Sequence, residues 1–145
     1  MAPIRQRRLL NCCTFAALLL PFGLFASELV VVDAHNPPVN LTPSQIRDVF
    51  LGRTASFPDG SIAIPVDQPD SSPLREEFYL KVTNRSAAQA RAHWAKLYFT
   101  GRGVPPREGT SSEDVKKILH STQGAIGYID GASLDDSLRV LLVVP

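Results

Sequence analysis

The sequence predicts a single-domain α/β protein, with about four strands in a mixed sheet flanked by about four helices. Two observations carry this prediction. The apolar segments that read as strands are continuous rather than alternating, and helical segments separate them in the order β-α-β-α-α-α-β-β. Continuous apolar strands are buried on both faces, so helices are expected to cover the sheet. No internal repeat, low-complexity stretch or linker divides the chain.

The first 27 residues have the three parts of an export signal. Met1–Arg8 carries three arginines and no acid, an apolar stretch follows over residues 9–25, and small residues close it at Ala26 and Ser27. A retained membrane anchor is the alternative, but the strongly apolar part is shorter than the roughly 20 residues that a spanning helix needs. We therefore expect cleavage after Ala26 or Ser27, a mature domain over residues 28–145, and a periplasmic location.

Composition excludes several classes of site. Both cysteines, Cys12 and Cys13, lie in the leader, so the mature domain has no disulfide and no thiol nucleophile. Without the leader, twelve Lys and Arg stand against fourteen Asp and Glu, which is no electrostatic footprint for nucleic acid. His93 and His120 fall in separate predicted helices, so no metal site and no cofactor is expected.

The first half of the mature chain contains two predicted strands and one helix. Residues 28–33 form an apolar run that predicts a buried strand. Thr42–Gln45 forms a capping box with proline in the first turn, and Gly52 is placed to end that helix in a left-handed conformation. Residues 62–66 predict the second strand, with Pro65 near its end.

The second half contains three predicted helices and two strands. Pro73 suits the first turn of a helix that reaches about Val82. A capping box at Ser86 opens the longest helix, which extends to Phe99, and its Trp94, Tyr98 and Phe99 are expected in the core. A fourth helix begins at residues 110–113 and reaches His120, and strands follow over residues 125–129 and 138–143.

Three loops could carry a ligand site. Asp67–Pro73 joins a strand end to a helix start, where serine hydroxyls and free backbone N–H groups can bind an anion; the alternative is that Ser71 or Ser72 merely caps the helix. Three arginines could donate paired hydrogen bonds to an oxyanion, or could be ordinary solvated surface charge: Arg102, Arg107 and Arg53. The glycines of residues 124–127 allow another group to come close to the backbone, either a packed neighbour or a ligand. Packing is the preferred explanation for these glycines.

No catalytic constellation is present. The nucleophile pattern Gly-x-Ser-x-Gly is absent from the sequence. Glu76 and Glu77 are adjacent on a predicted helix, so their side chains diverge by about 100° and cannot act as a carboxylate pair. The sequence does not predict an enzyme.

Four segments together resemble one family. Residues 41–53, residues 62–66, the serine-containing helix start with residues 75–78, and the Gly-Ala-Ile-Gly-Tyr segment at residues 124–128 are similar, in order and spacing, to the phosphate-binding proteins of ABC uptake systems. The resemblance implies the type 2 periplasmic-binding-protein fold. Because those proteins have two lobes, it also implies that this chain forms a single lobe, similar to short phosphate-binding-like proteins.

The resemblance also implies where a ligand would bind. Aligned on residues 75–78, Gln68 stands at the position of the family's phosphate-clamping arginine, and Asp70 and Ser72 keep the family's aspartate and serine. Pro73 and Leu74 replace a glycine and a threonine. The expected ligand-binding residues are therefore Gln68, Asp70, Ser71 and Ser72, with Arg53, Arg102 and Arg107 as helpers. Losing an arginine, a hydroxyl and an N–H donor weakens the expected anion binding by orders of magnitude.

These observations predict an exported, non-catalytic solute-binding-like protein that takes phosphate or another small oxyanion and works with an ABC permease. The alternative is a periplasmic interaction or sensory accessory module that has kept the fold and lost ligand binding. Such a module would dock on a membrane sensor, a transporter or a second copy of itself. A homodimer that rebuilds the cleft would reconcile the two functions.

Overall fold

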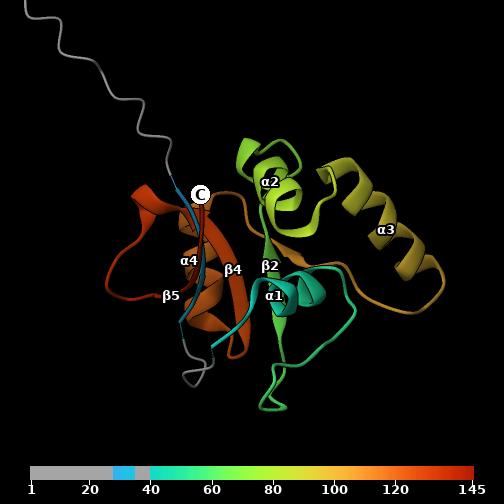
Figure 1. The fold of residues 1–145 in the computed structure, drawn as a ribbon, viewed down its shortest axis with the longest axis horizontal. Helices are drawn as coiled ribbons and strands as arrows, with labels where there is room; N and C mark the ends of the chain where they lie inside the picture. Colours follow the sequence, from blue (N-terminus) through green and yellow to red (C-terminus); the bar gives the residue numbers. More distant parts are fainter. Residues whose placement is uncertain (1–27, 35–39) are drawn as a thin grey trace, which may run out of the picture.

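A computed structural model describes residues 28–34 and 40–145, and the predicted leader lies outside them. Within this part the chain forms one five-stranded sheet with helices on both faces (Figure 1). The strands lie in the order β3-β2-β4-β1-β5. In chain order they are β1 (Leu29–Asp33), β2 (Ile64–Asp67), β3 (Arg107–Glu108), β4 (Ala125–Asp130) and β5 (Arg139–Val144).

The sheet is mixed, as the sequence predicts. β1 runs antiparallel to both of its neighbours, with Val31 opposite Tyr128 on β4 and Leu142 on β5. β2 runs parallel to β4 and to β3. The fifth strand is the two-residue β3, which the sequence prediction places in a loop, because a strand this short has no periodicity to detect.

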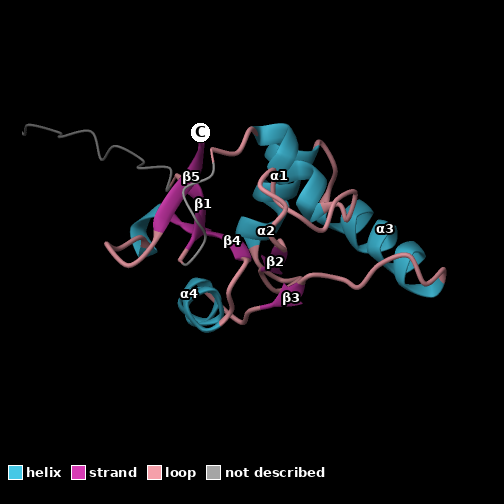
Figure 2. Cartoon of the chain, turned by 90° about the horizontal axis from the view of Figure 1, so that it is seen from below, coloured by secondary structure: helices cyan, strands magenta, loops and turns pink. Residues whose placement is uncertain are grey.

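Helices cover the sheet from both sides (Figure 2). They are α1 (Pro43–Phe50), α2 (Pro73–Phe78), α3 (Ala87–Phe99) and α4 (Ser112–Ser121), with a π-helical turn at Tyr79–Thr83 and a 3-10 turn at Gly131–Ser133. Side chains of α4 pack on one face of the sheet, and side chains of α1 and α2 pack on the other. α3 extends outward from the second group. None of the helices in the described part is long and apolar enough to cross a membrane.

The burial of β1 explains its uninterrupted apolar sequence. Leu29 and Val31 join the core cluster under α1 and α2, whereas Val30 and Val32 join the cluster under α4. Successive side chains of a strand point to opposite faces, so a strand between two helical layers needs apolar residues at every position.

The predicted helix boundaries depend on caps that the structure contains. Thr42 and Ser86 each form a complete capping box at the start of α1 and α3. Gly52 follows α1 with a φ of 67°, and a Cβ atom there would lie 2.5 Å from the ring of Trp94. The packing explanation for the later glycines also holds, because a Cβ on Gly127 would lie 2.9 Å from Val115.

The helix predicted to reach about Val82 does so as α2 followed directly by the π-helical turn over Tyr79–Thr83, which closes at Asn84, whose φ is 57°. Two other expectations were wrong in detail. Pro65 lies inside β2, which continues to Asp67.

Trp94 is buried as expected, but Tyr98 and Phe99 are 59% and 85% exposed. The reason is geometric: α3 reaches the core through its middle, where Ala90 and Trp94 lie, and its last turn extends past the sheet (Figure 1).

Candidate functional site

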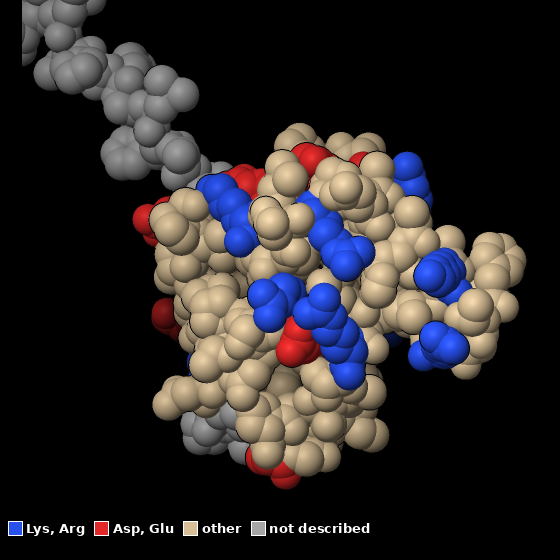
Figure 3. Space-filling model, turned by 45° about the vertical axis from the view of Figure 1, so that its right-hand side comes forward, with Lys and Arg blue, Asp and Glu red and all other residues tan. Residues whose placement is uncertain are grey.

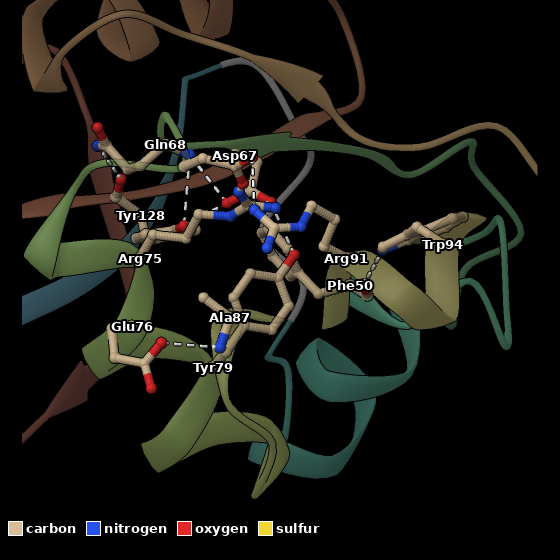
Figure 4. A network of polar contacts seen from close by, with 11 residues as sticks. Phe50, Asp67, Gln68, Arg75, Glu76, Tyr79, Ala87, Arg91, Trp94 and Tyr128 are labelled. Atoms are coloured by element: carbon tan, nitrogen blue, oxygen red, sulfur yellow. Dashed lines mark hydrogen bonds and ion pairs between the residues drawn. The ribbon is translucent and has the colours of Figure 1, made fainter. Parts of the chain in front are cut away.

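A buried carboxylate organises the end of β2. Asp67 is only 2% exposed, and it accepts hydrogen bonds from the Tyr79 hydroxyl at 2.8 Å, from the Tyr128 hydroxyl, and from the backbone N–H of Gln68 at 2.8 Å (Figure 4). A buried charge of this kind is tolerated only when it is paired and fully hydrogen-bonded. Donors from the π-helical turn and from β4 therefore fix the point at which the chain leaves the sheet.

Arg75 supplies the positive charge. Its Nε lies 3.2 Å from an Asp67 oxygen, and its Nη1 pairs with Asp70. The second oxygen of Asp70 lies 3.0 Å from Arg91 Nη1 on α3. This chain of charges joins the end of β2, the following loop, α2 and α3 (Figure 4).

The two tyrosines of this network are locked in the neutral form. Burial, and secondarily the negative charge of Asp67, raise the pKa of Tyr79 and of Tyr128 above the usual range for a phenol. Both hydroxyls consequently remain donors to the carboxylate.

The Gln68 side chain links β2 to β4 by a hydrogen bond. It is 2% exposed, and its side-chain nitrogen donates to the Tyr128 carbonyl at 3.0 Å and to Ser112 Oγ at 3.4 Å. The residue that aligns with the family's clamping arginine therefore ties β2 to β4 and to the start of α4.

Beside Gln68, a hollow of about 490 Å³ opens between the start of α2 and the start of α4. The two segments that line it are separated by roughly forty residues in the sequence. Its lining consists of Gln68, Pro69, Ser71, Ser72, Pro73, Leu74, Glu77, Thr110, Ser111, Ser112 and Asp130.

Serine hydroxyls dominate the chemistry of this hollow. Ser72 occupies the N-cap position of α2, but its side chain makes no capping hydrogen bond, so the expectation that a serine caps this helix holds for its position and not for its hydroxyl. Ser111 caps α4 by accepting from the Asp114 N–H at 3.2 Å. Ser112 Oγ accepts from Gln68 and from the Asp130 N–H, both at 3.4 Å. An oxygen that accepts in this way still has its proton to donate.

The charged side chains in the lining of the hollow are acidic, and one of them, Glu77, pairs with Lys81 at 2.8 Å. Glu77 and Asp130 lie in its lining, and no lysine or arginine of the described chain does. The hydroxyls thus offer hydrogen bonds to an oxyanion, whereas the two carboxylates repel one, and net affinity depends on that balance.

The structure brings together only part of the predicted site. Gln68, Ser71 and Ser72 share the hollow. Asp70 points instead to Arg75 and Arg91 and lines a different hollow next to α3.

None of the three predicted helper arginines lines the hollow beside Gln68. Arg53 pairs with Asp48 at 3.1 Å, Arg102 follows α3, and Arg107 lies on β3.

Sequence reasoning missed the roles of Arg75, Ser112 and Tyr128. Arg75 stands in an ordinary charged helical run, Arg-Glu-Glu, and nothing local marks it as buried. Ser112 was recognised only as part of a helix start. Its meeting with Gln68 depends on the β2–β4 pairing, which the sequence pattern cannot place in register. In the described residues no group of three or more His, Cys, Asp or Glu could hold a metal ion.

Comparison with known proteins identifies the fold. No protein-family model and no curated protein matches the chain. Among solved structures, a phosphate-bound protein from Clostridium perfringens, described as a phosphate ABC transporter substrate-binding protein, matches 79% of this chain with a TM-score of 0.63 and 23% identity. The ABC-type phosphate transport receptor of Vibrio cholerae matches with a TM-score of 0.61 and 19% identity, and PstS from Borrelia burgdorferi with 0.57 and 16%, each over 79% of this chain.

The chain spans less than half the length of these neighbours, 44%, 45% and 46% in turn. The prediction of a single lobe of the periplasmic-binding-protein fold is therefore confirmed. At these identities the likeness concerns the fold.

Proposed function

We propose that this chain is an exported, non-catalytic solute-binding-like protein related to the phosphate-binding components of ABC uptake systems. Its ligand lies in the hollow between the starts of α2 and α4, which we call the serine hollow. The observation that carries the proposal is the Ser72 hydroxyl: it stands at a helix start, lines the hollow and is not used to cap the helix. Phosphate is named in the descriptions of two of the three structural neighbours, those from Clostridium perfringens and Vibrio cholerae.

The serine hollow favours a weakly bound, partly protonated oxyanion. Serine hydroxyls donate to oxyanion oxygens, and a ligand that keeps one O–H can donate in turn to Glu77 or Asp130. Because no cation lines the hollow, we expect affinity in the millimolar range rather than the micromolar range. Phosphate, which keeps a proton at neutral pH, is expected to bind better than sulfate, which does not.

Calorimetric titration of residues 28–145 with phosphate, sulfate and molybdate at low salt tests this proposal. We expect saturable phosphate binding that Ser72→Ala weakens about tenfold, the loss of one hydrogen bond to a charged group. Retained affinity in Ser72→Ala, or equal binding of sulfate, would exclude the serine hollow as the site. Alanine variants of Arg53, Arg102 and Arg107 decide whether any predicted helper contributes.

The alternative function is an accessory module that docks on an ABC permease or a membrane sensor. The exposed aromatic pair Tyr98 and Phe99 favours it, since large exposed apolar groups in a cluster mark interaction surfaces. Absence of any heat with millimolar phosphate would favour this alternative. Light scattering over a range of protein concentrations decides whether two copies associate to rebuild a cleft.

A further inference from the structure

The outward side of α3 carries an apolar stripe, flanked by the exposed polar residues Gln89, Arg91 and Lys96. Ala88, Ala92, Ala95 and Phe99 recur at helical spacing and are exposed, while Ala90 and Trp94 on the opposite side are buried. A surface helix normally carries polar residues opposite its buried stripe, whereas α3 has three alanines and Phe99 there. The outer side of α3 therefore differs from an ordinary solvated helix.

The apolar surface continues into the loop after α3. A hollow of about 300 Å³ has Tyr98, Phe99, Pro105 and Pro106 in its lining, and Val104 beside it in sequence is 78% exposed. We call these groups together the α3 surface; it comprises the exposed residues Ala88, Ala92, Ala95, Tyr98, Phe99, Val104 and Pro105 and the half-buried Pro106.

Positive charge predominates in the segment that forms the α3 surface, although Asp70 and Glu108 also line its hollow. From Arg85 to Arg107 the sequence contains five Lys or Arg and no Asp or Glu, although the mature chain as a whole has more acids than bases. Lys96 and Arg102 in this segment are exposed, and Arg91 is exposed but pairs with Asp70 at 3.0 Å. Figure 3 shows blue side chains on the projecting part of the molecule, set among uncharged surface with no red beside them. Residues 85–107 are therefore basic, although the mature chain as a whole carries a small negative net charge.

This charge argues against a second copy as the occupant. Two α3 surfaces packed together would bring Lys96 and Arg102 of one molecule toward the same cations of the other, and like charges repel. A stable protein interface also buries roughly 800 Å² on each partner, whereas the α3 surface has only Tyr98, Phe99 and Val104 as large exposed apolar groups.

A lipid surface makes different demands. Peripheral binding needs a few aromatic or aliphatic side chains that enter the headgroup region and cations that meet anionic lipids. The α3 surface provides both on a projecting part of the molecule, and the acid-rich remainder of the chain lies behind it. We propose that the α3 surface binds the face of an anionic phospholipid bilayer, with Phe99 and Tyr98 in the headgroup region and Lys96 and Arg102 against lipid phosphates. This proposal is independent of solute binding in the serine hollow.

Vesicle sedimentation tests the proposal. The protein is residues 28–145, which contain every described strand and helix and lack the apolar leader, since the leader would bind lipid by itself. The vesicles are phosphatidylcholine alone, or phosphatidylcholine and phosphatidylglycerol in equal parts. We expect binding only to the anionic vesicles, with strong loss when salt is raised, because screening weakens contacts with headgroups.

Matched variants separate the α3 surface from the rest of the molecule. Phe99→Ser is compared with Ile62→Ser, which removes an apolar side chain that is 68% exposed elsewhere. Lys96→Glu is compared with Lys117→Glu on α4, which covers the opposite face of the sheet. We expect Phe99→Ser to lower partitioning about tenfold and Lys96→Glu at least fivefold, while the two controls stay within twofold of the parent chain.

Several results would overturn the proposal. These are no sedimentation with anionic vesicles, equal binding to neutral vesicles, or equal losses in the α3 variants and their controls. Self-association that Phe99→Ser abolishes, without vesicle binding, would assign the surface to a second copy. Binding of an acidic peptide but not of vesicles would assign it to a protein partner. Circular dichroism of every variant confirms that the fold is intact.

Discussion

Replacing Arg75 by methionine tests whether the buried network at the end of β2 holds the lobe together. Methionine keeps the length and the apolar stem of the arginine but removes the guanidinium that lies 3.2 Å from Asp67. Asp67 is left 2% exposed with no cation, although Tyr79, Tyr128 and the Gln68 N–H still donate to it.

The expected cost follows from that geometry. Removing one partner of a buried ion pair costs about 3–5 kcal/mol, and the three remaining hydrogen bonds place this case near the lower end. A loss of about 3 kcal/mol is a large part of the roughly 5–15 kcal/mol that stabilises a typical domain, and it lowers Tm by roughly 10 °C.

Urea unfolding followed by Trp94 fluorescence measures this loss, since Trp94 is the single tryptophan and is buried. Arg91→Met is the matched control: Arg91 pairs with Asp70 but is 61% exposed, so we expect a loss below about 1 kcal/mol. In an Asp67→Asn background the Arg75→Met change should cost much less. A loss below about 1 kcal/mol for Arg75→Met, or equal losses for both arginines, would refute the reasoning.

Three further predictions concern stability. Above about pH 10 the free energy of unfolding should fall by roughly 1.4 kcal/mol per pH unit for each of Tyr79 and Tyr128, because their raised pKa means that the unfolded chain releases the phenol protons first. Ultraviolet titration should show two phenols that ionise only as the chain unfolds, and their ionisation in the folded protein would contradict this. Gly124→Ala should destabilise by about 3 kcal/mol and Gly101→Ala by only about 1, since φ is positive at both but only at Gly124 would the Cβ collide with a backbone carbonyl; thermal melts compare them. Ser86→Ala should lose about 1 kcal/mol in urea unfolding through its capping box, and an unchanged midpoint would show that the cap is not needed.

The parts of the fold that sequence predicts well are those with local signals. Thr42 and Ser86 are followed three residues later by glutamine, and Gly52 stands where only a left-handed residue fits, so these helix ends were correctly predicted. The uninterrupted apolar run of β1 likewise predicts a strand that is buried on both faces, whereas an alternating pattern predicts burial on one face.

The candidate site was predicted only in part, because it is assembled by long-range pairing. Gln68, Ser71 and Ser72 of the loop after β2 line one hollow, and their role in ligand binding stays a prediction. The partners that decide their roles, Ser112 and Tyr128, arrive from α4 and β4, and no local pattern links them to Gln68. The exposure of Phe99 was missed for a related reason: helical spacing shows that side chains share a face, but it does not show where the helix leaves the core.

The pairing of β1 with β5 has a consequence for how such a lobe can be joined to other chains. Leu29 at the start of β1 lies directly opposite Val144 at the end of β5, so the polypeptide enters and leaves the lobe at adjacent points. A unit with neighbouring ends can be inserted within another protein, or released from one, at a single junction without threading or breaking its core. The same geometry predicts that a short linker between the two ends would permit circular permutation, with new termini in surface loops.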